Sequence, residues 1–124
     1  MKEKKYTVEY VESLDLQAIP SGSKRRFWCK IVSDAFGKRI DVPVLVAKGH
    51  NPGQVLGLTA AVHGNELNGV PVIQRLFKEL DVEQLSGTVL AVPVVNVPAF
   101  MSRKRRFIDS VDLNHIMPGV SDGT

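Results

Sequence analysis

Several residue types are scarce in this sequence, and each scarcity excludes a class of protein. The 124 residues contain one cysteine, Cys29. An intrachain disulfide scaffold is therefore excluded, and a reducing compartment is favoured. No apolar run approaches the roughly 20 residues that cross a bilayer, and no apolar segment follows the charged residues 1–5, as a secretory signal would require. We therefore expect a cytoplasmic protein with no membrane partner, and we interpret Cys29 as a packed residue.

Charge of one sign is also limited. The formal net charge is +3, and much of the excess lies in two clusters, at residues 2–5 and 103–106. Basic clusters attract nucleic acid, anionic lipid or small anions. The second cluster has no interleaved aromatic residues, so we favour a solvated loop or a funnel for an anionic substrate over a nucleic-acid contact.

The length predicts one domain, residues 1–124, and its first third has the pattern of strands. Strands are expected at residues 6–12, 26–32 and 40–47, with a hairpin connection at 34–38 and antiparallel pairing. A turn is expected at residues 49–53. We therefore interpret residues 1–53 as a β-rich portion.

Beyond this portion, residues 54–124 have the pattern of a strand, a helix and a second strand. Residues 55–62 are apolar or small throughout, which is typical of a strand covered on both faces. Pro71 is tolerated only near a helix start, so a helix is expected from about Asn68. Its apolar face consists of Val72, Ile73, Leu76, Phe77 and Leu80. With a second apolar strand at 88–97, this is a βαβ unit with parallel strands, and the fold class is α/β.

His63 and Glu66 follow the first strand of this unit, three residues apart. Imidazole and carboxylate groups are ligands of catalytic zinc, which uses three protein ligands and keeps one open position. Gly64 allows a sharp turn between them. The alternative is that Glu66 only favours the positive end of the helix. Because ligands bind where parallel strands end, we predict a metal site that shares a cleft with the basic loop.

The sequence leaves the third metal ligand open. His50 precedes the strand, and about nine strand residues of roughly 3.3 Å each would place it near the opposite edge, as a solvated turn residue. His115, Asp109 and Asp112 lie in the loop on the correct side. Either one of these three completes the site, or this chain is not the whole catalytic unit.

Two blocks of the sequence match motifs of a known family. The first is His-Gly-Asn-Glu-Leu-Asn-Gly at residues 63–69. The second runs from the strand end at 93–100 through Arg106-Phe107 to Asp-Leu-Asn-His-Ile-Met-Pro-Gly at 112–119. Together they resemble the zinc motif and the substrate block of the succinylglutamate desuccinylase/aspartoacylase family. That resemblance covers roughly residues 40–120 and implies the mixed sheet of zinc carboxypeptidase-like hydrolases.

The resemblance also implies a function. The expected activity is zinc-dependent hydrolysis of an amide or ester bond in a small carboxylate-bearing substrate, such as an N-acyl amino acid. His63 and Glu66 would bind Zn²⁺. Asn114 would hold the substrate carboxylate, and Arg106 would assist it or polarise the scissile carbonyl.

Two positions of the second block depart from the family pattern. His115 stands where the family has arginine, and histidine is shorter and only partly charged near neutral pH. As a substrate-binding residue it would therefore hold a carboxylate differently. Arg105 and Arg106 both precede Phe107, so the substrate arginine is Arg106 or, one residue earlier, Arg105.

The family's third zinc ligand (a histidine) and its catalytic glutamate lie downstream of the second block. The resemblance thus implies a truncated, N-terminal part of a catalytic domain, with no general base and little activity alone. Strand edges left without partners favour self-association as a homo-oligomer. Two other functions stay open: a non-catalytic module that binds small anions, and a basic nucleic-acid-binding domain.

Overall fold

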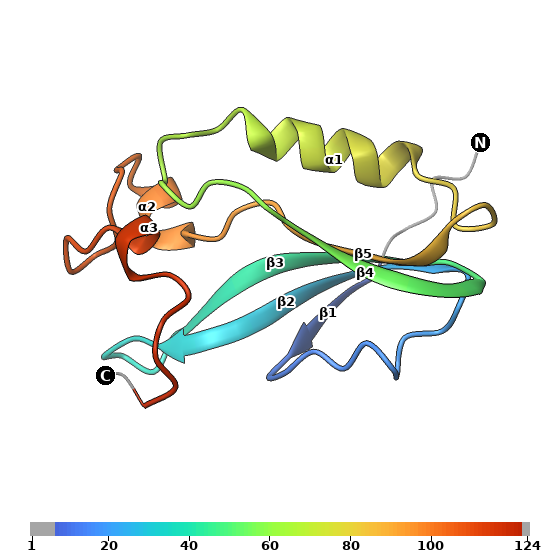
Figure 1. Ribbon diagram of the computed structural model, residues 1–124. Helices are drawn as coiled ribbons and strands as arrows, with labels where there is room; N and C mark the ends of the chain where they lie inside the picture. Colours follow the sequence, from blue (N-terminus) through green and yellow to red (C-terminus); the bar gives the residue numbers. More distant parts are fainter. Residues whose placement is uncertain (1–6, 123–124) are drawn as a thin grey trace.

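Strands from both portions of the chain join in one mixed sheet, with a helix lying along one of its faces (Figure 1). The computed structural model describes residues 7–122. The strand order is β1-β2-β3-β5-β4. This sheet with few helices confirms the predicted α/β class. The elements are β1 (Val8–Val11), β2 (Ser23–Ser33), β3 (Arg39–Lys48), β4 (Asn51–Thr59), α1 (Gly69–Glu79), β5 (Ser86–Val92), α2 (Val97–Met101) and α3 (Leu113–Ile116).

The hairpin of β2 and β3 forms where the sequence predicts it. The two strands pair antiparallel over most of their length. The carboxylate of Asp34 caps the turn by accepting hydrogen bonds from the backbone N–H groups of Phe36 and Lys38, both at 2.9 Å. Side-chain acceptors of this kind replace backbone partners in tight turns.

The predicted antiparallel pairing is wrong for the first strand, because β1 runs parallel to β2. Residues 12–22 run back beside the sheet before β2 begins, so the chain enters both strands in the same direction (Figure 1). Ile19 of this segment is 6% exposed and packs against Phe27 and Val44. The returning segment therefore covers one face of the sheet.

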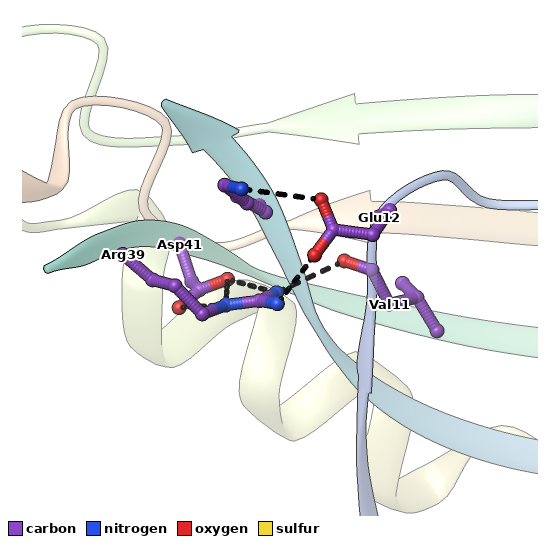
Figure 2. Close-up of polar contacts among 5 residues, drawn as sticks. Val11, Glu12, Arg39 and Asp41 are labelled. Atoms are coloured by element: carbon purple, nitrogen blue, oxygen red, sulfur yellow. Dashed lines mark hydrogen bonds and ion pairs between the residues drawn. The ribbon is translucent and has the colours of Figure 1, made fainter. Parts of the chain in front are cut away.

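Arg39 links the end of β1 to β3, as Figure 2 shows. Its guanidinium donates to Glu12 Oε1 at 2.7 Å, to Asp41 Oδ1 at 2.8 Å and to the Val11 carbonyl at 3.2 Å. Lys30 adds an ion pair with Glu12 at 3.4 Å. Half-exposed pairs contribute little singly, but this network fixes where β1 leaves the sheet.

Alternation along β3 gives the sheet two apolar faces. Val44 and Val46 belong to the cluster under residues 12–22, whereas Ala47 packs with Phe77 of α1 and Val89 of β5. Successive strand residues point to opposite faces, which explains this division. Helix α1 begins at Gly69, as predicted, and buries Ile73 and Phe77.

The βαβ unit has the predicted parallel strands, although their ends differ from the prediction. β4 pairs with β5 through partners such as Leu56 and Val89. β4 already begins at Asn51, so the predicted turn at residues 49–53 is partly strand. β5 ends at Val92 rather than continuing to residue 97, because the next residue is a proline, which cannot donate to the ladder.

The prediction that the first strand of this unit is covered on both faces is wrong for the described residues. β4 is an edge strand, and Val55 and Leu56 are both more than half exposed. Val72 and Leu76, on the predicted apolar face of α1, are also exposed. The apolar pattern is real, but residues 7–122 supply no element that covers these side chains. No helix in this range is long and apolar enough to cross a membrane.

Candidate metal site

Two hydrogen bonds, one from a backbone N–H and one from a side chain, anchor the loop after β4 to Asn96, in the segment after β5. Ala61 has a φ of 49°, which turns the chain away from the strand direction. β4 therefore ends at Thr59, before the predicted end at residue 62. The Ala61 carbonyl accepts the Asn96 N–H at 3.1 Å. The Asn96 side chain, only 1% exposed, donates to the Val62 carbonyl at 3.2 Å. The buried amide thereby fixes the backbone that leads directly into His63.

Gly64 matters for close packing rather than for a left-handed turn. Its φ is not positive. A Cβ atom at this position would overlap the backbone of Ala99, Phe100 and Lys104, and its N–H donates to the Arg105 carbonyl at 3.3 Å. The predicted role of a sharp turn is therefore replaced by close approach of two backbones.

The imidazole of His63 lies between two carboxylates. Its Nδ1 is 3.0 Å from Glu66 Oε2, and its Nε2 is 2.8 Å from Asp112 Oδ1. His63 is 7% exposed, yet Nδ1 makes no hydrogen bond of acceptable geometry. The short distance to Glu66 thus brings a buried ring nitrogen and a carboxylate oxygen together without a hydrogen bond between them. Two such atoms side by side are suited to sharing a cation.

Asp112 holds the opposite side of the ring. Its side chain is buried, and the same Oδ1 accepts the Asn114 N–H at 3.0 Å, which caps α3. When neutral His63 donates Nε2–H to Asp112, the ring's lone pair is on Nδ1, facing Glu66. Metal-binding histidines are commonly oriented by a carboxylate on the other nitrogen.

Arg105 completes a closed set of charged contacts. Its Nη1 donates to Glu66 Oε1 at 3.0 Å, and its Nε lies 3.6 Å from Asp112 Oδ2. The Arg105 and Glu66 side chains are each more than half exposed, unlike those of His63 and Asp112. The four residues therefore form a ring that is open to solvent on one side.

These contacts shift the pKa values of the site. The hydrogen bond to Asp112, and secondly the close Glu66 carboxylate, raises the pKa of His63 above its ordinary 6.5, while burial and Arg105 oppose the rise. The close imidazole of His63 lowers the pKa of Asp112, to which it is hydrogen-bonded, and of Glu66. Without a metal, the cluster therefore favours charged carboxylates around a protonated imidazole.

A comparison with protein families identifies the domain. The model of the "Succinylglutamate desuccinylase/Aspartoacylase catalytic domain" matches residues 52–124, which is more than half of the chain. The chain belongs to the succinylglutamate desuccinylase/aspartoacylase family. The resemblance seen in the two sequence motifs is therefore confirmed.

The chain is also similar to a curated enzyme and to solved structures. An N-alpha-acetyl-L-2,4-diaminobutyric acid deacetylase of Halomonas elongata is 36% identical over 84 residues, which are 67% of this chain and 24% of the relative. The succinylglutamate desuccinylase/aspartoacylase structure from Rhodobacter sphaeroides has a TM-score of 0.76 at 30% identity over 90% of this chain. The product-bound ectoine utilization protein EutE (DoeB) of Ruegeria pomeroyi has a TM-score of 0.72 at 29% identity over 86% of this chain.

The chain is short beside these similar proteins. It spans 34% of each of the two solved chains and 24% of the curated deacetylase. The similarity therefore covers the part of the family fold that contains both of the sequence motifs.

Arg106, the arginine predicted from the family motif, does not contact the two predicted ligands, His63 and Glu66. Arg106 is exposed and lines a hollow of about 590 Å³ together with Lys104, Arg105 and Ser102. It is Arg105 that lies within ion-pair distance of Glu66. Both arginines therefore line the hollow, but Arg105 also forms an ion pair with Glu66.

The remaining predicted residues occupy the helix α3 and the far end of β4. Asn114 and His115 are exposed on α3, directly after Asp112. His50 lies at the other end of β4, where its Nε2 is 3.0 Å from Glu83 Oε1. The prediction that His50 is remote from the metal pair is confirmed.

None of the candidates for a third ligand joins His63 Nδ1 and Glu66. The Asp109 carboxylate accepts the Val111 N–H at 2.9 Å and so caps a turn. Asp112 faces the other ring nitrogen. Across residues 7–122, no three or more histidine, cysteine, aspartate or glutamate side chains are grouped so that they could hold a metal ion.

The sequence prediction missed the orienting contact of Asp112 and the buried link made by Asn96. The sequence predicts Asp112 only as a candidate third ligand. Its place at the start of the Asp-Leu-Asn block was the available signal, but sequence spacing does not show which ring nitrogen a carboxylate 49 residues away will meet.

Proposed function

We propose that this chain forms the zinc-binding part of a hydrolase that cleaves the acyl bond of an N-acyl amino acid or a related small carboxylate. The observation that carries the proposal is the placement of His63 Nδ1 beside Glu66 Oε2, at 3.0 Å, with Asp112 bonded to the other ring nitrogen. The deacetylase among its relatives, which is named for an acetylated amino acid, supports the substrate class.

The residues present fit two of the ligand positions of a zinc site. His63 Nδ1 is buried and without a hydrogen bond, and Glu66 offers a carboxylate oxygen next to it. A third protein ligand would come from outside the described residues. When bound, zinc at such a site polarises an acyl carbonyl and lowers the pKa of a water molecule.

The basic loop would bind the substrate's carboxylate. The hollow of about 590 Å³ is lined by three cationic side chains and by the hydroxyl residues Ser102 and Ser110, with no carboxylate among its lining residues. Guanidinium groups present a fork that matches a carboxylate. We assign Arg106 of this loop, and Asn114 and His115 of α3, to substrate binding.

The residues of this chain would thus bind zinc and orient the substrate. Proton transfer from water needs a general base in addition to them. Glu66 and Asp112 are both held by His63 and Arg105. Asp112 already accepts hydrogen bonds from His63 and from the Asn114 N–H, while Glu66 accepts one from Arg105 and is a proposed zinc ligand, so both are poor general bases. We therefore expect weak zinc binding and little hydrolysis by the chain alone.

Elemental analysis of the purified chain tests the zinc assignment. The variant is His63→Ala/Glu66→Ala, and the matched control is His50→Ala/Glu83→Ala, which removes a His–Glu pair with the same 3.0 Å separation at the other end of β4. We expect zinc in the wild type and in the control, and its loss in the first variant.

The outcomes separate the candidate functions. Zinc retained after loss of His63 and Glu66 would contradict the assigned ligands. Absence of zinc from all three proteins would contradict the zinc-binding proposal, and binding of small dicarboxylates by such a protein would indicate the non-catalytic module instead. Steeply salt-dependent binding to nucleic acid would favour the third alternative.

A further inference from the structure

Arg105 lies within ion-pair distance of both carboxylates that flank His63, and the family motif offers it only a role at the substrate. We propose that Arg105 is a positioning residue, which holds the Glu66 carboxylate so that one oxygen alone faces the metal position. This inference rests on the proposed zinc site. The observations are the 3.0 Å bond from Nη1 to Glu66 Oε1 and the 3.0 Å separation of Glu66 Oε2 from His63 Nδ1.

Glu66 needs such an anchor because little else restrains it. Its side chain is 60% exposed, and it lies in the loop before α1, where its backbone N–H bonds to the His63 carbonyl at 3.1 Å. A glutamate that is free to rotate loses considerable side-chain entropy when it is fixed. Arg105 engages the oxygen that points away from His63, so it orients the carboxylate without occupying Oε2.

The shape of the guanidinium suits this role. Nη1 reaches Glu66, which precedes α1, while Nε lies 3.6 Å from Asp112, which precedes α3. One planar group therefore spans two carboxylates on separate segments. A lysine ammonium carries the same charge at a single point and could not reproduce both contacts at their observed separation.

The Arg105 backbone is itself hydrogen-bonded to the loop that contains His63 and Glu66. Its carbonyl accepts the N–H of Gly64, which lies between the two proposed ligands. The backbone bond places Arg105 beside the motif, and the side chain then reaches Glu66. Arg105 is thus bonded to this segment twice, through its backbone to Gly64 and through its side chain to Glu66.

The exposure of this pair predicts which property it controls. Ion pairs that are about half exposed contribute little to fold stability. Partners that orient metal ligands, in contrast, commonly change metal affinity by about 10- to 100-fold. Arg105 should therefore affect zinc affinity much more than thermal stability.

The substitution Arg105→Lys tests this in the full 124-residue chain, because it keeps the charge near the metal and removes the fork. Lys104→Arg is the matched control, a reciprocal change at the neighbouring position. Zinc affinity is measured by competition with a chelator, and the melting temperature is measured without zinc. We expect Arg105→Lys to weaken zinc binding by about tenfold, with an unchanged melting temperature, and Lys104→Arg to match the wild type.

Wild-type zinc affinity in Arg105→Lys would overturn the positioning role while leaving the zinc site intact. An equal loss in Lys104→Arg would also overturn it, because the effect would then belong to the loop as a whole. A fall in melting temperature that accompanies the loss of affinity would indicate a structural role and count against the proposal. Failure of the wild type to bind zinc is a different result, since it removes the proposed function and this inference together.

Discussion

Asp112 and His63 are joined by a 2.8 Å contact between Oδ1 and Nε2, although 49 residues separate them in the sequence. The contact uses the ring nitrogen that faces away from Glu66. It therefore fixes the imidazole in the orientation in which Nδ1 is available to a metal.

Replacing Asp112 with asparagine should weaken zinc binding by about tenfold, because the amide no longer attracts the Nε2–H as a charged acceptor. The control is Asp109→Asn, which alters a turn-capping carboxylate in the same loop that does not contact His63. Chelator competition measures both. Equal affinities in the two variants would contradict an orienting role for Asp112.

Stability should depend on pH through the same cluster. Because the pKa of His63 is raised, its contribution is complete below its ordinary value of 6.5 and is lost as pH rises through the raised value. Because the pKa values of Glu66 and Asp112 are lowered, their contributions are present above the ordinary values of 4.5 and 3.8 and are lost as pH falls through the lowered ones.

The zinc-free chain should therefore gain most from the cluster between about pH 4.5 and pH 6.5. Urea unfolding of the wild type and of Asp112→Asn, measured across this range in the presence of a chelator, gives the difference in free energy of unfolding. That difference should be largest inside the window and smaller on both sides. A difference independent of pH would show that these ionisations are not linked to folding.

Alanine at Gly64 should destabilise the fold by about 1–3 kcal/mol, the usual cost of overpacking, because its Cβ would overlap the backbone of α2 and of Lys104. It should also weaken zinc binding, since His63 and Glu66 flank the displaced residue. Gly57→Ala is the control, because a Cβ there meets nothing within 4 Å. Denaturant unfolding should separate the two variants, and equal stabilities would argue against the close approach.

The edge strand β4 should promote self-association. It contains no charged residue, and Val55 and Leu56 are exposed on it, which leaves an unprotected edge. Leu56→Lys should shift the chain toward the monomer on a sizing column. Phe36→Lys, at the tip of the β2–β3 hairpin and 97% exposed, should not. An unchanged elution volume for Leu56→Lys would exclude β4 as the contact.

The features of the fold that sequence could predict were those set by local patterns. The hairpin at Asp34, the helix start near Gly69 and the parallel pairing of β4 with β5 all follow from turn chemistry and periodicity. The direction of β1 and the exposure of β4 could not be predicted in this way. They depend on which segments lie beside a strand, and an apolar run does not predict which segments those are.

The candidate site divides in the same way. His63 and Glu66 could be selected from their spacing and from the strand before them, and the structure brings Nδ1 and Oε2 to 3.0 Å. Asp112 and Arg105 reach the pair from 49 and 39 residues away. Their roles depend on which ring nitrogen and which carboxylate oxygen each one meets. Those are facts of three-dimensional geometry that no sequence interval specifies.

The bond between Gly64 N–H and the Arg105 carbonyl makes the metal motif and the basic loop one mechanical unit. A ligand that binds His63 and Glu66 would stabilise the folded arrangement of these two segments by mass action. The amide protons of Gly64 and Asn114, which bond to Arg105 and Asp112, would then exchange with solvent more slowly. The amide of Asn114 would thus report on occupancy of a site whose proposed ligands lie about 50 residues earlier in the chain.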